Sequence, residues 1–129
     1  MHCARRAVQR FGQRGLAVQA VGNGSDFTKL ITNARKDRLL VIDYSATWCR
    51  PCVEFGPIFD TMSEAFAQQA DFFKVDIDQL PDQTAEARVT AVPTFHLVRN
   101  GKTVATVTGA DQDELEKMIN KHAAAEGSN

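Results

Sequence analysis

Two cysteines three positions apart, Cys49 and Cys52, have the spacing of a reactive dithiol. They follow the apolar run at residues 39–42 and open a helical pattern, so we expect Cys49 at a helix N-terminus. Unpaired backbone N–H groups and the helix dipole stabilise an anion there, and the thiolate is the nucleophilic form of cysteine. Pro51 suits a first helical turn because it has no N–H to lose. The segment therefore predicts that Cys49 attacks a disulfide and that Cys52 resolves the mixed disulfide.

Hydrophobic periodicity predicts the elements that position this pair. Apolar and β-branched runs indicate strands, and apolar residues at i, i+3, i+4 and i+7 indicate helices. The first helix is expected to run from an N-cap at Ser25 to about Asp37, and Asn100-Gly101 is a signal of a type I′ hairpin turn. The predicted strands cover residues 17–21, 39–42, 72–77, 94–98 and 102–107, and further helices are predicted from 49, from 81 to 88 and from 111.

The predicted element order, β-α-β-α-β-α-β-β-α, belongs to the α/β class. Alternating β-α-β units require parallel strands joined by right-handed crossovers, and the last hairpin adds an antiparallel pair. We therefore expect a mixed central β-sheet flanked by helices on both faces. A chain of 129 residues has room for one such core.

The first residues differ in composition from the rest of the chain. Four arginines occur there, and no acidic residue precedes Asp26. In a helix, Arg6, Arg10 and Arg14 would stack on the side opposite to apolar residues. An arginine-rich, acid-free, amphipathic start is typical of a mitochondrial transit peptide, so we expect a mitochondrial protein.

We divide the chain into a basic amphipathic leader, residues 1–16, a folded domain, residues 17–124, and a tail, residues 125–129, that is expected to fray. The leader could instead be a disordered basic tail or follow from a misplaced start codon, and the protein would then be cytoplasmic. The lone Cys3 would leave with the leader. A net charge of -1 offers no basic excess for nucleic acid, and no apolar run approaches the ~20 residues that cross a bilayer. The mature protein is expected to be a monomer without a membrane partner.

From about Val18 to Lys121 the chain resembles the thioredoxin family. Residues 48–52 match the family's W-C-x-P-C motif, which is more specific than a lone C-x-x-C. Other landmarks follow the family's order: the buried strand aspartate Asp43, the helix-kinking proline Pro57, the strand lysine Lys74, the cis-proline segment Val92-Pro93-Thr94 and the glycine Gly109 near the substrate groove.

The resemblance implies a protein-disulfide reductase with the thioredoxin fold. Asp43 would accept the proton that Cys52 loses, and the pKa of its buried carboxyl would be raised and tuned by Lys74. No bound cofactor and no metal are expected. The partners would be disulfide-containing client proteins and a thioredoxin reductase or equivalent that supplies electrons from NADPH. The residues that would contact the client are Trp48, Arg50, Pro51, Val92, Pro93 and Gly109.

Some residues depart from the family pattern. Arg50 stands where the family usually has glycine, and its cation is expected to lower the pKa of Cys49 and make the couple more oxidising. Ser45 and Val53 replace a frequently aromatic residue and the customary lysine, which changes the rim of the site. We interpret His96 as an ordinary sheet residue rather than as a ligand.

Three other functions are compatible with parts of the pattern. An oxidase or isomerase of the same fold is the main alternative, and Arg50 makes it less remote. Half of a zinc site is disfavoured because no second C-x-x-C or paired histidine supplies the remaining ligands. A non-catalytic binding module is disfavoured because both cysteines, Asp43 and Pro93 are present together.

Overall fold

The computed structural model describes residues 18–33 and 38–127, so the predicted leader and Cys3 lie outside the described residues. The strands are β1 (Val18–Ala20), β2 (Leu39–Ser45), β3 (Ala70–Asp76), β4 (Thr94–Arg99) and β5 (Lys102–Thr108). The helices are α2 (Gly24–Thr32), α3 (Arg50–Ala65), α4 (Pro81–Glu86) and α5 (Gln112–Gly127). This element order is the one predicted from the sequence.

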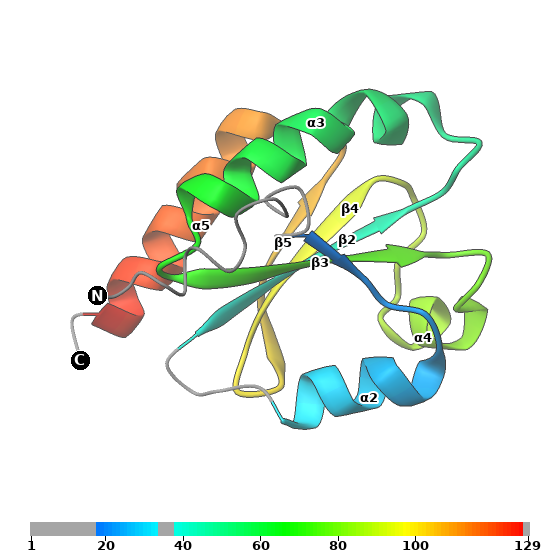
Figure 1. Cartoon of the computed structure of the whole chain (residues 1–129), viewed down its shortest axis with the longest axis horizontal. Coiled ribbons are helices and arrows are strands. Elements are labelled where there is room, and N and C mark those ends of the chain that lie inside the picture. The colour runs from blue at the N-terminus through cyan, green and yellow to red at the C-terminus, as the bar shows by residue number, and fades with distance from the viewer. Residues whose placement is uncertain (1–17, 34–37, 128–129) are drawn as a thin grey trace, which may run out of the picture.

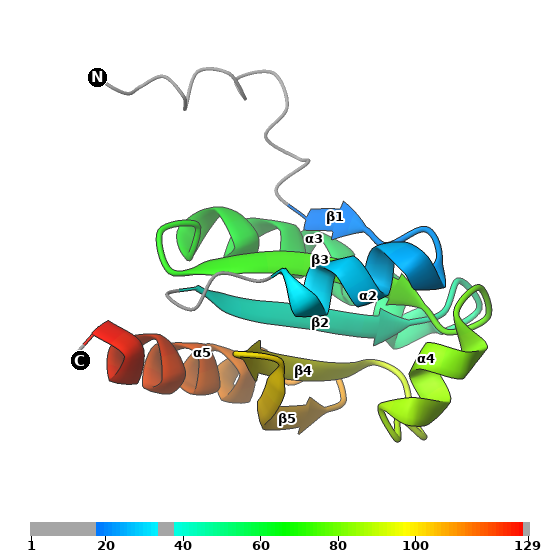
Figure 2. The same cartoon turned by 90° about the horizontal axis from the view of Figure 1, so that it is seen from below.

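The strands form one mixed sheet with β2 at its centre. The strand order is β1-β3-β2-β4-β5, which Figure 2 shows across the molecule. β1, β3 and β2 run parallel, whereas β4 is antiparallel to β2 and β5 is antiparallel to β4. α3 and α5 cover one face of the sheet, and α2 and α4 lie on the other (Figure 1). The predicted fold class is confirmed.

A hydrophobic core lies on each face of the sheet. Successive side chains of a strand point to opposite faces, so β2 contributes to both cores. Leu39 and Val41 pack with residues of α3 and α5, whereas Leu40 and Ile42 pack with residues of α2. Every residue of β2 is buried, as expected of a continuous apolar run in a central strand. β2 therefore holds its last residues in fixed positions at one end of the sheet.

The ends of α2 differ from the prediction. The N-cap is Asn23 rather than Ser25, and the Asn23 side chain accepts a hydrogen bond from the backbone N–H of Asp26 at 2.8 Å. Asn23 has the extended backbone that an N-cap needs, with φ -158°, whereas Ser25 already lies inside the helix. The helix ends at Thr32, and Asp37, its predicted end, lies outside the described residues.

The C-terminal half follows the pattern more closely. Asn100 and Gly101 have φ values of 56° and 78°, so the predicted positive-φ hairpin turn is confirmed. α5 continues to Gly127, into the segment 125–129 that was expected to fray. None of the described helices has both the length and the apolar character needed to span a bilayer.

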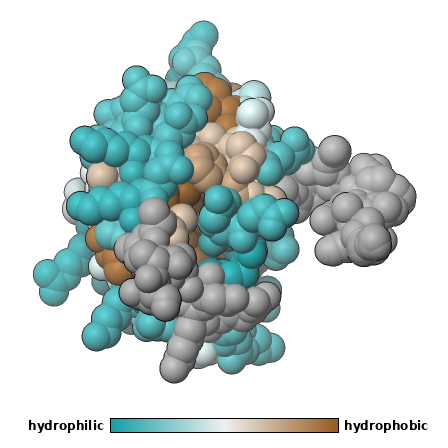
Figure 3. Space-filling view, turned by 90° about the vertical axis from the view of Figure 1, so that its left-hand side faces the viewer, coloured by the Kyte–Doolittle hydropathy of each residue, from teal (hydrophilic) through white to brown (hydrophobic). Residues whose placement is uncertain are grey.

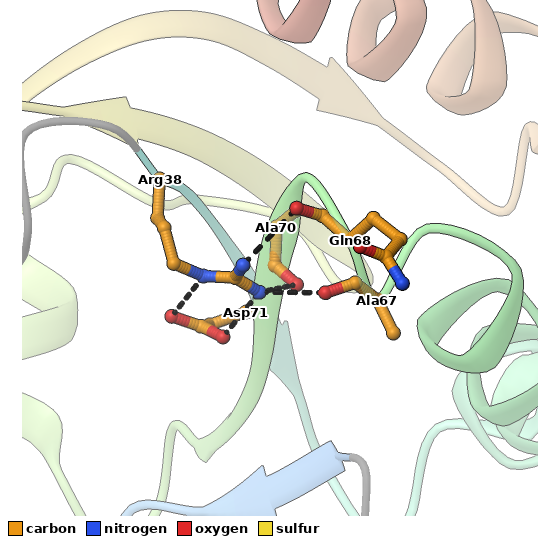
Figure 4. Close-up of polar contacts among 5 residues, drawn as sticks. All are labelled: Arg38, Ala67, Gln68, Ala70 and Asp71. Carbon is orange, nitrogen blue, oxygen red and sulfur yellow. Dashed lines mark hydrogen bonds and ion pairs between the residues drawn. The ribbon is translucent and has the colours of Figure 1, made fainter. Parts of the chain in front are cut away.

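Arg38 lies just before β2, at the end of the sheet where β2 and β3 begin. Figure 3 faces this end and shows polar side chains around a smaller apolar area. The Arg38 guanidinium donates to both carboxylate oxygens of Asp71, at 3.1 and 2.8 Å. It also donates to the carbonyl oxygens of Ala67, Gln68 and Ala70 at 2.8 to 3.1 Å (Figure 4). One side chain thus provides hydrogen bonds to carbonyl oxygens that follow the end of α3, where no further helical N–H groups are available as donors.

Candidate active site

The first turn of α3 places both cysteines. Cys49 is the N-cap of α3, and its Sγ accepts the backbone N–H of Cys52 at 3.2 Å. The two residues form a disulfide with their Cα atoms 5.3 Å apart. Pro51 lies in the first turn, where its missing N–H removes no helical hydrogen bond. Cys49 therefore sits at a helix N-terminus, the position that the spacing predicts.

The segment just before β4 lies beside the disulfide. The Val92–Pro93 peptide bond is cis, and the Val92 carbonyl oxygen lies 3.8 Å from Cys49 Sγ. The Pro93 carbonyl accepts the backbone N–H of Gly109 at 2.8 Å. Gly109 has φ +93°, a conformation that favours glycine. Residues predicted to contact a client from two distant parts of the sequence are thus brought together at one edge of the site.

Asp43 is a buried carboxylate on the central strand, with 2% of its surface exposed. It projects from the same face of β2 as Val41, the face that α3 covers. Its Oδ1 atom is enclosed and has no hydrogen-bond partner among the described residues. Burial raises the pKa of Asp43 from 3.8 to about 7, and the charge of Lys74, its register neighbour on β3, opposes part of this rise. A carboxyl with this pKa can bind and release a proton near neutral pH.

Trp48 is exposed and held in place by a residue that the sequence interpretation missed. Its side chain is 67% exposed, and its Nε1–H donates to Asp78 Oδ2 at 2.9 Å. Asp78 follows β3, and the backbone N–H of Asp78 is bonded to Asp76 Oδ1 at 2.9 Å. Local spacing carried no signal for this pairing because thirty positions separate the two side chains. The only hint was an aspartate just after a parallel strand that neighbours β2.

Arg50 forms an ion pair with a residue one turn further along its own helix. Its Nε–H donates to Glu54 Oε2 at 3.0 Å, and the two side chains are 86% and 65% exposed. This ion pair and the surrounding water screen the cation that was expected to act on Cys49. Val53, on the same turn, is 60% exposed and adds an apolar side chain to the rim.

Comparison with known proteins settles the family. A family model described as Thioredoxin matches residues 18–121, a range that includes every residue of the site described above. The chain belongs to the thioredoxin family. It is 47% identical to thioredoxin H2 of Arabidopsis thaliana, over 66% of this chain and 63% of that protein. It is 38% identical to a thioredoxin of Ictalurus punctatus, over 79% of this chain and 95% of that protein.

Solved thioredoxin structures have the same fold. Thioredoxin NaTrxh of Nicotiana alata superposes with a TM-score of 0.79 at 39% identity, covering 82% of this chain and 92% of that chain. Fasciola hepatica thioredoxin superposes with a TM-score of 0.75 at 36% identity, covering 81% of this chain and 98% of that chain. The agreement extends over nearly all of the described domain.

As a thioredoxin, the protein is a thiol–disulfide oxidoreductase. It reduces disulfides in client proteins through the reversible Cys49–Cys52 pair and receives electrons from a reductase. Thioredoxins carry no bound cofactor. Among the residues that the structure describes, no group of three or more His, Cys, Asp or Glu side chains could hold a metal ion.

Proposed function

We propose that Cys49 is the attacking thiol, Cys52 the resolving thiol and Asp43 the proton acceptor of this thioredoxin. The observation that carries the assignment is the position of Cys49 Sγ at the N-terminus of α3, where the Cys52 N–H points at it. A thiolate at this position gains from that hydrogen bond and from the helix dipole. Both cysteines are buried in the oxidised form, with 6% of Cys49 and 4% of Cys52 exposed, so the assignment rests on the N-cap position of Cys49 and not on exposure.

The reaction proceeds by two exchanges of sulfur partners. The Cys49 thiolate attacks one sulfur of the client disulfide, forms a mixed disulfide and releases the other client sulfur as a thiolate, which is then protonated. Cys52 loses its proton to Asp43 and attacks Cys49 Sγ, which releases the second client thiol and closes the internal disulfide. The client gains two electrons and two protons, and the protein is left in the oxidised form seen here.

The client segment binds in an extended form beside Val92 and Pro93. The cis bond directs the Val92 backbone toward Cys49, and main-chain hydrogen bonding recognises a client strand with little dependence on its side chains. Trp48, Arg50 and Pro51 line the rim on the side of α3, and Gly109 fixes the carbonyl of Pro93. Lys74 adjusts the pKa of Asp43 rather than contacting the client.

Insulin reduction in the presence of dithiothreitol tests this assignment. The parent should precipitate reduced insulin, and Cys49→Ser should be inactive because no attacking thiol is left. Cys52→Ser should also fail to turn over. When its reduced form is freed of dithiothreitol and mixed with insulin, it should accumulate a mixed disulfide that is visible on a non-reducing gel. A trapped complex in Cys49→Ser instead, with none in Cys52→Ser, would reverse the two roles.

A Cys3→Ser background is the matched control for these variants. It removes the third thiol while leaving the described domain unchanged. Full activity of Cys3→Ser alone would show that the trapped complex depends on the pair at the start of α3. Equal loss of activity in Cys3→Ser would contradict the proposal.

The Arg50–Glu54 ion pair weakens the case for an oxidase. Glu54 offsets the positive charge of Arg50, so this charge stabilises the Cys49 thiolate of the reduced form less. We propose a reductase that draws its electrons from NADPH through a flavoenzyme. We expect a reduction potential of about -270 mV, which is typical of a thioredoxin that acts as a reductant. A potential near that of strong oxidants would favour the oxidase reading.

We further propose that residues 1–16 direct the protein to mitochondria and that the mature protein is monomeric and does not bind membranes. The support is the arginine-rich, acid-free composition of this segment. Fusion of residues 1–16 to a fluorescent protein should give mitochondrial fluorescence. Diffuse fluorescence would place the protein in the cytoplasm, and light scattering of the domain would measure its mass.

A further inference from the structure

A hollow of about 180 Å³ lies on the face of the sheet that α3 and α5 do not cover. In Figure 1 this face is turned downward, toward α2 and α4. Residues of α2, the end of α4, β2, β4 and the β4–β5 hairpin line the hollow. It is separated by the sheet from the core of α3, the helix that begins at the disulfide.

The walls of the hollow are mostly apolar. Phe27 and Ile31 of α2 face Ala87, which follows α4, and Ile42 and Val98 contribute from β2 and β4. An apolar cavity of ~150 Å³ is large enough to hold one benzene molecule. The hollow is therefore of the right size for a single six-membered ring with a small substituent.

Two buried polar side chains open into this apolar space. His96 is 7% exposed and Tyr44 is 1% exposed, and their rings meet edge to face with centroids 5.1 Å apart. Neither the imidazole nor the hydroxyl has a hydrogen-bond partner among the described residues. The polar atoms of both groups also keep some accessible surface, unlike the enclosed Oδ1 of Asp43. Both residues line the hollow, and a ligand there could provide the missing hydrogen-bond partners.

The charge state of these groups selects the ligand. Burial lowers the pKa of His96 and raises the pKa of Tyr44 to about 12, so both side chains are neutral at pH 7. A neutral imidazole has one nitrogen that accepts a hydrogen bond, and a phenol hydroxyl both donates and accepts. Glu86, the one charged side chain among the described lining residues, sits at the exposed rim and repels anions.

We propose that this hollow binds a small neutral aromatic molecule that carries one hydroxyl group, of the phenol class. The ring lies against Phe27, Ile42 and Val98, the ligand hydroxyl donates to the His96 imidazole, and the Tyr44 hydroxyl donates to the ligand oxygen. The site lies apart from the disulfide, so occupancy leaves client reduction intact. The proposal adds a ligand-binding role to His96, which lies within β4 as the sequence interpretation expected.

Nuclear magnetic resonance titration of the oxidised full chain with phenol, toluene and benzoate tests the proposal. Phenol should shift the ring signals of His96 and leave those of His122, on α5, unchanged. Toluene lacks the hydroxyl and should bind about tenfold more weakly, because the two buried polar groups stay unpaired. Benzoate should not bind, because it brings an anion into an apolar site beside Glu86. Equal affinity for all three probes, or no shift at His96 with phenol, would overturn the proposal.

Three variants assign binding to the hollow. Ala87→Leu fills it from the end of α4 and should weaken phenol binding at least about tenfold. Ala85→Leu, at an exposed position of the same helix, is the matched control and should bind like the parent. His96→Phe keeps a ring of similar size and should bind phenol and toluene equally. Phenol binding by Ala87→Leu with unchanged affinity would contradict the location.

Insulin reduction separates this proposal from the one above. The parent should keep the same rate in saturating phenol, and Ala87→Leu should reduce insulin at the parental rate. Inhibition by phenol that competes with insulin would mean that the ring binds at the disulfide rather than in the hollow.

Discussion

Arg38 and Asp43 stand near the two ends of β2, and their surroundings are opposite. The Arg38 guanidinium donates hydrogen bonds to one carboxylate and to three carbonyl oxygens, so its charge is compensated by neighbouring groups. Asp43 is more deeply buried, yet one of its oxygens has no partner among the described residues. A satisfied charge contributes to stability, whereas an unsatisfied buried carboxyl is maintained at a cost in stability. In the mechanism that we propose, this unpartnered carboxyl is the group that takes up the proton of Cys52.

The largest expected effect is on stability at the Asp43 end. The pKa of Asp43 is raised by folding from 3.8 to about 7, so the folded form holds a proton that the unfolded chain has lost between these values. The free energy of unfolding therefore falls as pH rises from 4 to 7, by up to about 4 kcal/mol. Asp43→Asn should remove this dependence and become more stable than the oxidised parent at pH 8 but not at pH 4.

Urea unfolding of the oxidised proteins at several pH values measures this difference. Asp60→Asn, at an exposed position on α3, is the matched control and should follow the parent. A difference between Asp43→Asn and the parent that stays constant from pH 4 to 8 would show that Asp43 is ionised throughout and not desolvated.

The next effect is of opposite sign and lies at the Arg38 end. Arg38→Met removes five hydrogen bonds and leaves backbone carbonyls after α3 without a partner. The variant should lose about 2 kcal/mol of unfolding free energy at neutral pH, with unchanged insulin reduction. Lys117→Met, on the exposed side of α5, should cost far less. A loss no larger than that control would mean that water replaces Arg38 without penalty.

A smaller effect, on activity, is expected for the Asp43 variant but not for the Arg38 variant. Asp43→Asn should slow insulin reduction about tenfold at pH 7, because Cys52 loses its proton acceptor. The parental rate should rise with pH through about 7 as Asp43 ionises, and the variant should lack that rise. Rates of single turnovers with reduced protein give this profile. A parallel profile in both proteins would assign the proton to another acceptor.

The smallest effect concerns the Arg50–Glu54 ion pair. Arg50→Gly should slow alkylation of Cys49 by iodoacetamide roughly twofold at pH 6, and Glu54→Gln should speed it by a similar factor, because both side chains are exposed. Raising the salt concentration should bring all three proteins together. Shifts in the same direction for both variants would show that the effect comes from packing and not from charge.

The sequence allowed the fold to be predicted because its strongest signals are local. The apolar run of β2, the Asn100-Gly101 turn and the cysteines at the start of α3 each act within a few residues. The misplaced cap of α2 has a simple cause: Asn23 and Ser25 are both good N-caps, and only the extended backbone of Asn23 decides between them.

The contacts that could not be predicted join distant segments. Trp48 with Asp78, and Arg38 with the carbonyls after α3, depend on how β3 lies beside β2. The Arg50–Glu54 pair has helical spacing and could have been recognised, which would have tempered the expected effect of Arg50 on Cys49. The unpartnered oxygen of Asp43 required the complete surroundings of the side chain.

Trp48 is the single tryptophan of the chain, and it directly precedes Cys49. Trp48 is two-thirds exposed, and its indole nitrogen donates a hydrogen bond to Asp78. The tryptophan emission of the unlabelled protein therefore originates at one known point beside the disulfide. Reduction of the disulfide or binding of a client changes the surroundings of the Trp48 indole. The fluorescence of Trp48 should therefore report each step of the reaction.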